Sequence, residues 1–328
     1  MVRIWIIIIA WLANGCLGEL ESSRRVSRTR ILAIQAEPPT VMLGATTRLR
    51  ALVASPVGED VEGTALRWLD CGGETRPDES RDLCRENPER TVGTGFEVEY
   101  QLPENLDPAL VAEQSFTGGY WQRVSLQVAG AGENYDRAFK RVVVQLPSGM
   151  PTPPTEAPNR NPRMVEPVVE ILKEGSDDVE AVLGVDEPLR PDVRYRFSFD
   201  FPVEDHELFM RRYVDLSGLD LAKIEEVSEE DLLARVRQVE TYESLRMRAY
   251  TTDGRVGETQ LGTTKNEGVE AGERSYYPFH WQFSIPLLEG FEETPRAEPL
   301  PSEIRLWFIV YDGRGGIDWL AWSRALAP

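Results

Sequence analysis

The stretch VRYRFSFDF, from Val193 to Phe201, indicates the fold class of this chain most clearly. Every second residue in it is apolar, and the residues between them are polar or charged. A period of two places the apolar side chains on one face of a β-strand and the polar ones on the other. The stretch therefore predicts a strand that buries one face, and shorter stretches of the same kind recur along the chain.

Residues 164–328 are predicted to form an antiparallel β-sandwich with a helical insertion near 204–240. The other strands are expected at residues 164–172, 245–251, 277–285, 304–311 and 317–324. Between the second and third strands the period changes. Ser228 to Asp231 reads as a capping box, which marks the start of a helix. The residues that follow it at helical spacing are Leu232, Leu233, Val236 and Val239.

A proline-rich segment separates this region from an earlier one. Residues 147–163, PSGMPTPPTEAPNRNPR, contain six prolines and are expected to form an extended interdomain linker. Before it, residues 30–146 contain six or seven short alternating stretches separated by turn residues. Phe96 to Leu102 is an example. Strands of this length and spacing predict a second antiparallel sandwich, so the chain is expected to be mainly β.

Three stretches carry a resemblance to known families. RILAIQAEPPTVMLGATTRLRALV (30–53) and GGYWQRVSLQV (118–128) resemble bacterial immunoglobulin-like and PKD-like domains, which implies that the sandwiches are immunoglobulin-like. IRLWFIVYDGRGGIDWLAWS (304–323) is similar to the C-terminal hairpin of uncharacterised two-domain lipoproteins of myxobacteria-like Gram-negative bacteria, and residues 33–44 are similar to their opening strand. That resemblance supports the architecture and implies no function.

The N-terminus has the layout of a bacterial secretory signal. Arg3 is followed by an apolar run that is too short to cross a bilayer, and small or polar residues lead up to Cys16. Residues 12–16, LANGC, resemble the lipobox of bacterial lipoproteins, in which the cysteine is acylated and the chain is cut just before it. We expect a signal peptide at 1–15 and a lipid-anchored tether at 16–29. The alternative is an ordinary signal peptide with an incidental Cys16.

Charge and targeting together suggest where the protein works. The formal net charge is −19, or near −20 without the signal peptide (35 basic minus 55 acidic residues). This charge argues against binding to nucleic acid. The expected location is the outer membrane, as a lipoprotein that faces the periplasm or the cell surface. The expected partners are the membrane, through the acyl anchor, and a protein or an envelope glycan.

Two cysteines remain if Cys16 carries lipid. Cys71 and Cys84 form an even pair in an oxidising compartment, and a disulfide between them would close a loop of about 14 residues. In the chain-entropy model such a loop is worth about 3 kcal/mol. A metal site is the alternative, but His206 and His280 are both distant in sequence, and a zinc site needs two more nitrogen or sulfur ligands. The disulfide is therefore favoured.

No motif nominates a catalytic residue, a metal site or a cofactor. Only His206 and His280 could serve as a histidine base, and G-x-S-x-G is absent from the sequence. Acidic pairs are expected from composition alone. The acidic turns 174–178 and 312–313 do not match a calcium-binding loop and are read as solvated turns.

The aromatic residues near the C-terminus suggest one possible ligand site. Tyr276 and Trp322 are the pair expected to be exposed, where they could stack on a sugar. The function expected from the sequence is nevertheless a non-catalytic binding or spacer module of the cell envelope. The alternative is a lipoprotein that binds or acts on carbohydrate, and the discriminating observation is a set of exposed Trp or Tyr rings on one face.

Overall fold

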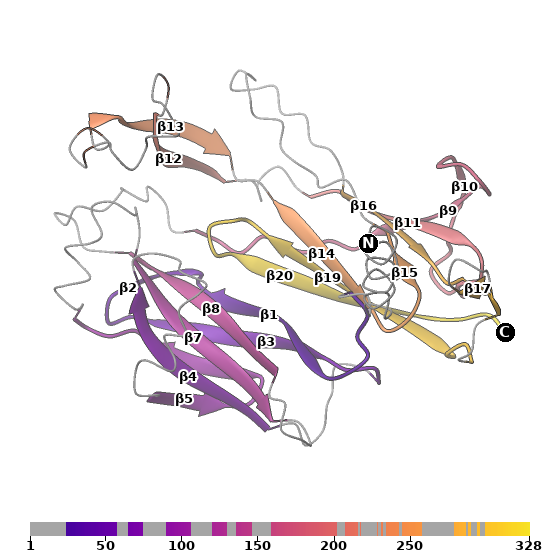
Figure 1. The fold of residues 1–328 in the computed structure, drawn as a ribbon, viewed down its shortest axis with the longest axis horizontal. Helices are drawn as coiled ribbons and strands as arrows, with labels where there is room; N and C mark the ends of the chain where they lie inside the picture. Colours follow the sequence, from indigo (N-terminus) through magenta and orange to yellow (C-terminus); the bar gives the residue numbers. More distant parts are fainter. Residues whose placement is uncertain are drawn as a thin grey trace, which may run out of the picture.

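The structure is a computed structural model, and it consists almost entirely of β-strands (Figure 1). It describes residues 24–57, 65–74, 90–105, 120–129, 136–145, 159–201, 207–215, 217, 228, 231, 234–242, 245–257, 279–286, 288–289, 294–295 and 299–328. Among these residues, no helix is long and apolar enough to cross a membrane.

The first sandwich packs a three-stranded sheet against a five-stranded sheet. The three-stranded sheet has the order β1 (Arg30–Glu37), β3 (Thr46–Ala54), β6 (Glu97–Gln101). The five-stranded sheet has the order β2 (Thr40–Met42), β8 (Asp136–Gln145), β7 (Tyr120–Ala129), β4 (Ala65–Glu74), β5 (Arg90–Thr94). All pairs are antiparallel except β2 with β8. Trp68 and Tyr100 are buried between the sheets, and the Trp68 ring nitrogen donates a hydrogen bond to the Gly95 carbonyl at 2.7 Å.

The second sandwich has the same plan. Its five-stranded sheet has the order β10 (Val179–Val182), β9 (Val168–Leu172), β11 (Arg194–Phe199), β16 (Phe279–Ser284), β15 (Arg255–Val256). Its three-stranded sheet has the order β14 (Arg246–Thr251), β19 (Glu303–Tyr311), β20 (Ile317–Ala325). Phe197, from the stretch that indicated the fold, packs edge-on against Trp322 across the core, with ring centroids 5.0 Å apart. Two antiparallel sandwiches are thus confirmed.

The structure does not support the helical insertion near 204–240. Most described residues of this segment form an antiparallel hairpin of β12 (Leu208–Val214) and β13 (Val236–Tyr242), and between these strands only Asp231 and Ala234, among the described residues, have a helical conformation. The cap itself forms, because Ser228 Oγ accepts a hydrogen bond from the Asp231 backbone N–H at 3.1 Å. The helical conformation does not continue past Ala234, because β13 begins at Val236 and β-branched residues such as Val236 and Val239 favour a strand. Another short pair, β17 (Leu288–Glu289) and β18 (Thr294–Pro295), lies later in the chain.

The expected tether at 16–29 includes residues that belong to the folded body. Arg24 to Val26 run beside β14, with the Val26 N–H bound to the Thr251 carbonyl at 2.8 Å and the Thr251 N–H bound to the Arg24 carbonyl at 3.0 Å. The side chain of Val26 is fully buried. The segment from Arg24 on is therefore part of the folded body, whereas the signal peptide at 1–15 and Cys16 lie outside the described residues.

The disulfide between Cys71 and Cys84 stays a prediction. Cys71 lies in β4 with its side chain 1% exposed, and Cys84 lies outside the described residues. We expect that alkylation of the exported protein in denaturant without a reductant labels neither thiol, because both sulfurs are bonded. The denaturant matters, since burial alone would protect Cys71. A matched sample treated with reductant should label both, and quantitative labelling of both without reductant would contradict the pairing.

Candidate functional site

A buried apolar cluster joins the two sandwiches, and we call it the seam. It lies between the face of β1 and β3 that points away from the first core and the face of β14 and β19 that points away from the second (Figure 1). Its buried residues are Val26, Leu32, Ala33, Leu52, Ala54, Trp307 and Ile309. The side chains of Trp307 and Ile309 are almost completely buried in the seam. Burial of this apolar surface stabilises a fixed contact between the two domains.

Strand β19 supplies both the seam and the core of the second sandwich. Trp307 and Ile309 face the seam, whereas Leu306 and Phe308 face the core. A strand that is covered on both faces reads as a continuous apolar run, as strands buried inside parallel sheets do. Strand β1 is also covered on both faces. A register shift between Ile31 and Ala33 lets some of its residues face the core and their neighbours face the seam.

The turn between β19 and β20 is a polar docking element beside the seam. The Asp312 carboxylate accepts hydrogen bonds from the backbone N–H groups of Arg314 at 2.7 Å and Gly316 at 2.9 Å. Asn159, from the end of the linker, donates its side-chain N–H to the same carboxylate at 2.8 Å. Lys140 of β8 in the first sandwich donates to the Gly315 carbonyl. The turn therefore ties together both sandwiches and the linker.

Burial sets the electrostatics of this turn. Desolvation lowers the pKa of Lys140 to about 8, and the negative charge of Asp312 acts in the opposite direction. Desolvation also raises the pKa of Asp312, while the hydrogen bond from Asn159 and the two backbone N–H groups act to lower it. Buried charges of this kind are tolerated only where hydrogen bonds and an opposite charge surround them. The turn needs the first sandwich in place to satisfy that requirement.

Asn161 forms a second polar tie. Its side-chain N–H group donates to the Ala36 carbonyl at 2.8 Å and to the Glu37 carboxylate at 2.6 Å, both at the end of β1. Its side-chain oxygen accepts a hydrogen bond from the Ile317 N–H at 3.0 Å, at the start of β20. Gln35 donates to the Ile317 carbonyl at 2.7 Å. The C-terminal end of the linker is thus bound to both domains.

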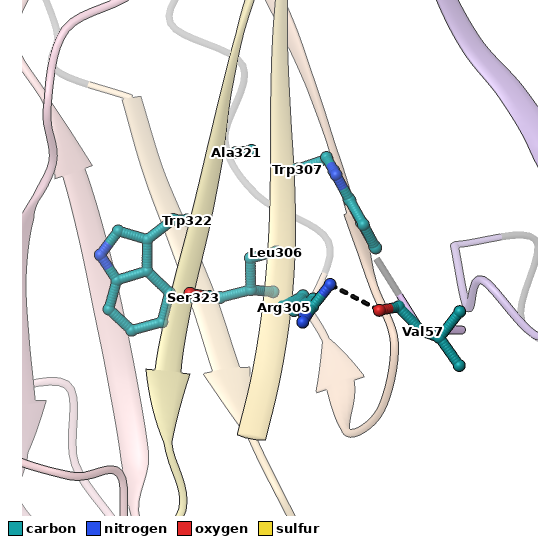
Figure 2. Close-up of a pocket in the computed structure, with 7 residues that line it drawn as sticks. All are labelled: Val57, Arg305, Leu306, Trp307, Ala321, Trp322 and Ser323. Carbon is teal, nitrogen blue, oxygen red and sulfur yellow. Dashed lines mark hydrogen bonds between the residues drawn. The ribbon is translucent and has the colours of Figure 1, made fainter. Parts of the chain in front are cut away.

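A cavity of about 460 Å³ opens beside the seam (Figure 2). It is lined by Val57, Arg305, Leu306, Trp307, Ala321, Trp322 and Ser323. Figure 2 shows Arg305 and Trp307 on the side of Val57, while the Trp322 ring points to the other side of β20. The Arg305 guanidinium donates to the Val57 carbonyl at 2.7 Å, which is a further link between the domains. Trp307 is 1% exposed, so the cavity offers little aromatic surface for stacking.

The outer face of the second five-stranded sheet carries a chain of hydrogen bonds around His280. Ser198 Oγ lies 2.9 Å from His280 Nδ1 and 3.1 Å from the Glu170 carboxylate, which Arg196 also binds at 2.6 Å. Burial, and next the charge of Arg196, lowers the pKa of His280. In a hydrolytic triad the acid orients the histidine, whereas here Glu170 bonds to the serine. The three side chains therefore form a hydrogen-bond network on the sheet surface, in which no acid orients His280 to activate Ser198.

The sequence-based ligand site does not form as expected. Trp322 is 8% exposed and packs in the core of the second sandwich, so its expected exposure is wrong. Strand β20 turns Trp322 inward, opposite Leu306 of β19, and Trp281 and Trp307 are buried as well. Tyr276 and His206 lie outside the described residues. Within the residues that the structure describes, no group of three or more His, Cys, Asp or Glu could hold a metal ion.

Sequence reasoning missed Asn159, Asn161 and Lys140. All three act over more than a hundred residues of sequence, and no local pattern encodes such contacts. The sequence does contain one signal for Lys140. The chain has few lysines, and Lys140 lies beside apolar residues in an expected strand. A lone lysine in a strand that is otherwise expected to be buried requires an acceptor nearby.

No protein-family model matches the chain, and the curated proteins contain no similar sequence. The solved structures with weak similarity to this chain include three whose names are informative. They are dimeric latent PorU from Porphyromonas gingivalis (11% identity, TM-score 0.21), Dpr2 Ig1-Ig2 in complex with DIP-Theta Ig1-Ig3 (8%, 0.18) and the collagen adhesin from S. aureus (8%, 0.15). These alignments cover 92%, 94% and 93% of this chain, and 24%, 63% and 99% of the other chains. The chain thus spans about a quarter of the PorU chain and less than two thirds of the second. The assignment of the fold rests on the sheets and cores described above.

Proposed function

We propose that this protein is a non-catalytic, lipid-anchored module of the cell envelope that holds two β-sandwiches as one rigid unit and presents a binding surface to a partner. The seam carries this proposal. A pair of domains that only needed to be connected would be served by the proline-rich linker alone. Here the linker end, the turn at Asp312 and the Arg24–Val26 segment all bind to both domains or lie between them.

The anchor is proposed to act directly on the seam. Cys16 and Arg24 are eight residues apart, and a fully extended chain spans at most about 3.5 Å per residue. An acyl group on Cys16 would hold the seam within about 28 Å of the membrane. The N-terminal segment enters between the two sandwiches, so neither domain could pivot freely on a long tether. This geometry suits a spacer that sets the orientation of whatever it binds.

Acylation of Cys16 is the first test of this function. We expect mass spectrometry of the detergent-extracted protein to show a mature chain that begins at Cys16 and carries diacylglycerol. Substituting Cys16→Ser should abolish the modification and release the protein from the membrane fraction, because no second membrane-binding element is proposed. A wild-type product that is soluble and begins at another residue would overturn the anchored part of the proposal.

A further inference from the structure

Strand β10 forms an exposed edge of the second sandwich. It lies at the end of the five-stranded sheet, and in the part of the chain that the structure describes its outer side pairs with no strand. The β9–β10 hairpin projects from the body of the domain at the right of Figure 1. All four residues of β10 are exposed, so the strand covers no core on either face. An edge of this kind can pair with another chain, and many proteins protect such edges.

The exposed edge is unusually apolar. Val168 of β9, Val179 and Val182 of β10 and Val185 in the following turn are 52%, 37%, 61% and 81% exposed. Val179 pairs with Leu172 and Val182 pairs with Glu170, which faces the outer network around His280. Cross-strand partners share a face, so both valines lie on the outer face of the sheet. The N–H of Leu183 and the carbonyl of Asp178 bond toward β9, which leaves the other side of β10 open.

The surroundings of β10 are strongly acidic. Residues 166–187 contain Lys173 as their only basic residue and eight acids, which are Glu166, Glu170, Glu174, Asp177, Asp178, Glu180, Asp186 and Glu187. Of these, Glu170 binds Arg196 and Asp177 binds Arg194. Glu174, Asp178, Glu180 and Asp186 are exposed around the edge. The charge therefore favours a basic partner and disfavours a second copy of this acidic chain.

We propose that β10 binds an extended basic segment of a partner protein by strand addition. The backbone of the segment pairs with the open side of β10, and its alternate apolar side chains lie beside Val179 and Val182. Its basic side chains then lie near Asp178 and Glu180. This inference rests on the proposed binding function and names the class of partner. It is independent of the seam, because β10 and the seam lie on different sheets of the second sandwich.

The test uses the full-length protein in detergent and a fluorescein-labelled peptide of eight residues. In this peptide every second residue is Val, and the residues between are Lys or Arg. Fluorescence anisotropy at low salt is expected to show saturable binding that weakens as salt is raised, because exposed charges are screened. The double substitution Val179→Lys and Val182→Lys should weaken binding at least tenfold, since it removes apolar contacts and adds like charge. Met42→Lys is the control, because Met42 is 56% exposed and lies in β2 of the first sandwich. It should leave binding unchanged.

A second peptide separates strand addition from simple charge attraction. It has the same side chains, with every backbone nitrogen methylated, so that neither edge of the peptide can donate the hydrogen bonds of a strand. We expect its affinity to fall at least tenfold. Equal binding of the two peptides, or equal binding to wild type and the double variant, would overturn the proposal. Absence of binding by the first peptide, or sedimentation showing a dimer that Val182→Lys dissociates, would do the same. Acylation at Cys16 and cohesion of the two domains are measured separately, so these outcomes leave the proposed function standing.

Discussion

Replacing Trp307 by alanine is expected to uncouple the two sandwiches. The side chain is 1% exposed at the centre of the seam, and deleting a buried tryptophan typically costs about 3–5 kcal/mol. The lost contacts lie between the domains and not within either core. We therefore expect wild type to unfold in one cooperative transition and Trp307→Ala to unfold in two, as followed by calorimetry and by far-ultraviolet circular dichroism.

Trp322→Ala is the matched control for this experiment. It deletes the same side chain from the same hairpin, but Trp322 belongs to the core of the second sandwich, where its ring contacts Phe197. The expected result is a lower unfolding temperature for the second sandwich, without the separation into two transitions that loss of the seam produces. An unchanged unfolding curve for Trp307→Ala would show that the seam contributes no stability.

Replacing Gly316 by alanine is expected to destabilise the protein by about 3 kcal/mol or more. A Cβ atom at this position would lie 2.8 Å from the Arg160 carbonyl oxygen and would overlap the Asp312 carboxylate. The turn must then shift, and Asp312 loses hydrogen bonds that it needs while buried. Overpacking costs about 1–3 kcal/mol, and an unsatisfied buried polar group costs a similar amount. Urea unfolding followed by circular dichroism measures the change.

Gly313→Ala in the same turn is the control for Gly316→Ala. Gly313 has a φ of +78°, but a Cβ atom there meets no heavy atom within 4 Å. Its cost should come from backbone strain alone, at about 1–2 kcal/mol. Gly316→Ala is expected to lower the free energy of unfolding more than Gly313→Ala does. A larger loss for Gly313→Ala would mean that the turn is limited by its backbone conformation and not by its contact with the linker.

The alternating patterns predicted the strands well. Val193 to Phe201 contains β11, and the segments expected at 245–251, 304–311 and 317–324 correspond to β14, β19 and β20. A strand such as β11 is recognisable because one face meets a core and the other meets solvent. The expected helix at 204–240 depended on a periodicity that a strand can also contain. Val236 and Val239, two of the four apolar residues at helical spacing, lie in β13, and β-branched residues favour a strand.

The sequence carries a signal of the seam. Residues 306–310 of β19 and 31–34 of β1 are continuous apolar runs, whereas the strands with one solvated face alternate. Such runs indicate a strand covered on both sides, and two of them, in separate sandwiches, could have suggested a domain contact. The polar ties made by Asn159, Asn161 and Lys140 could not be foreseen, because their partners are fixed by the tertiary arrangement alone.

Cleavage of the linker tests most directly whether the two sandwiches form one unit. A protease recognition sequence placed within residues 147–158 leaves Asn159 and Asn161 in place and allows the chain to be cut after folding. The seam predicts that the two fragments elute together in size-exclusion chromatography, at the volume of the uncut protein, and that Trp307→Ala makes them separate. Fragments of the wild-type sequence that separate after the cut, each folded by circular dichroism, would contradict the account.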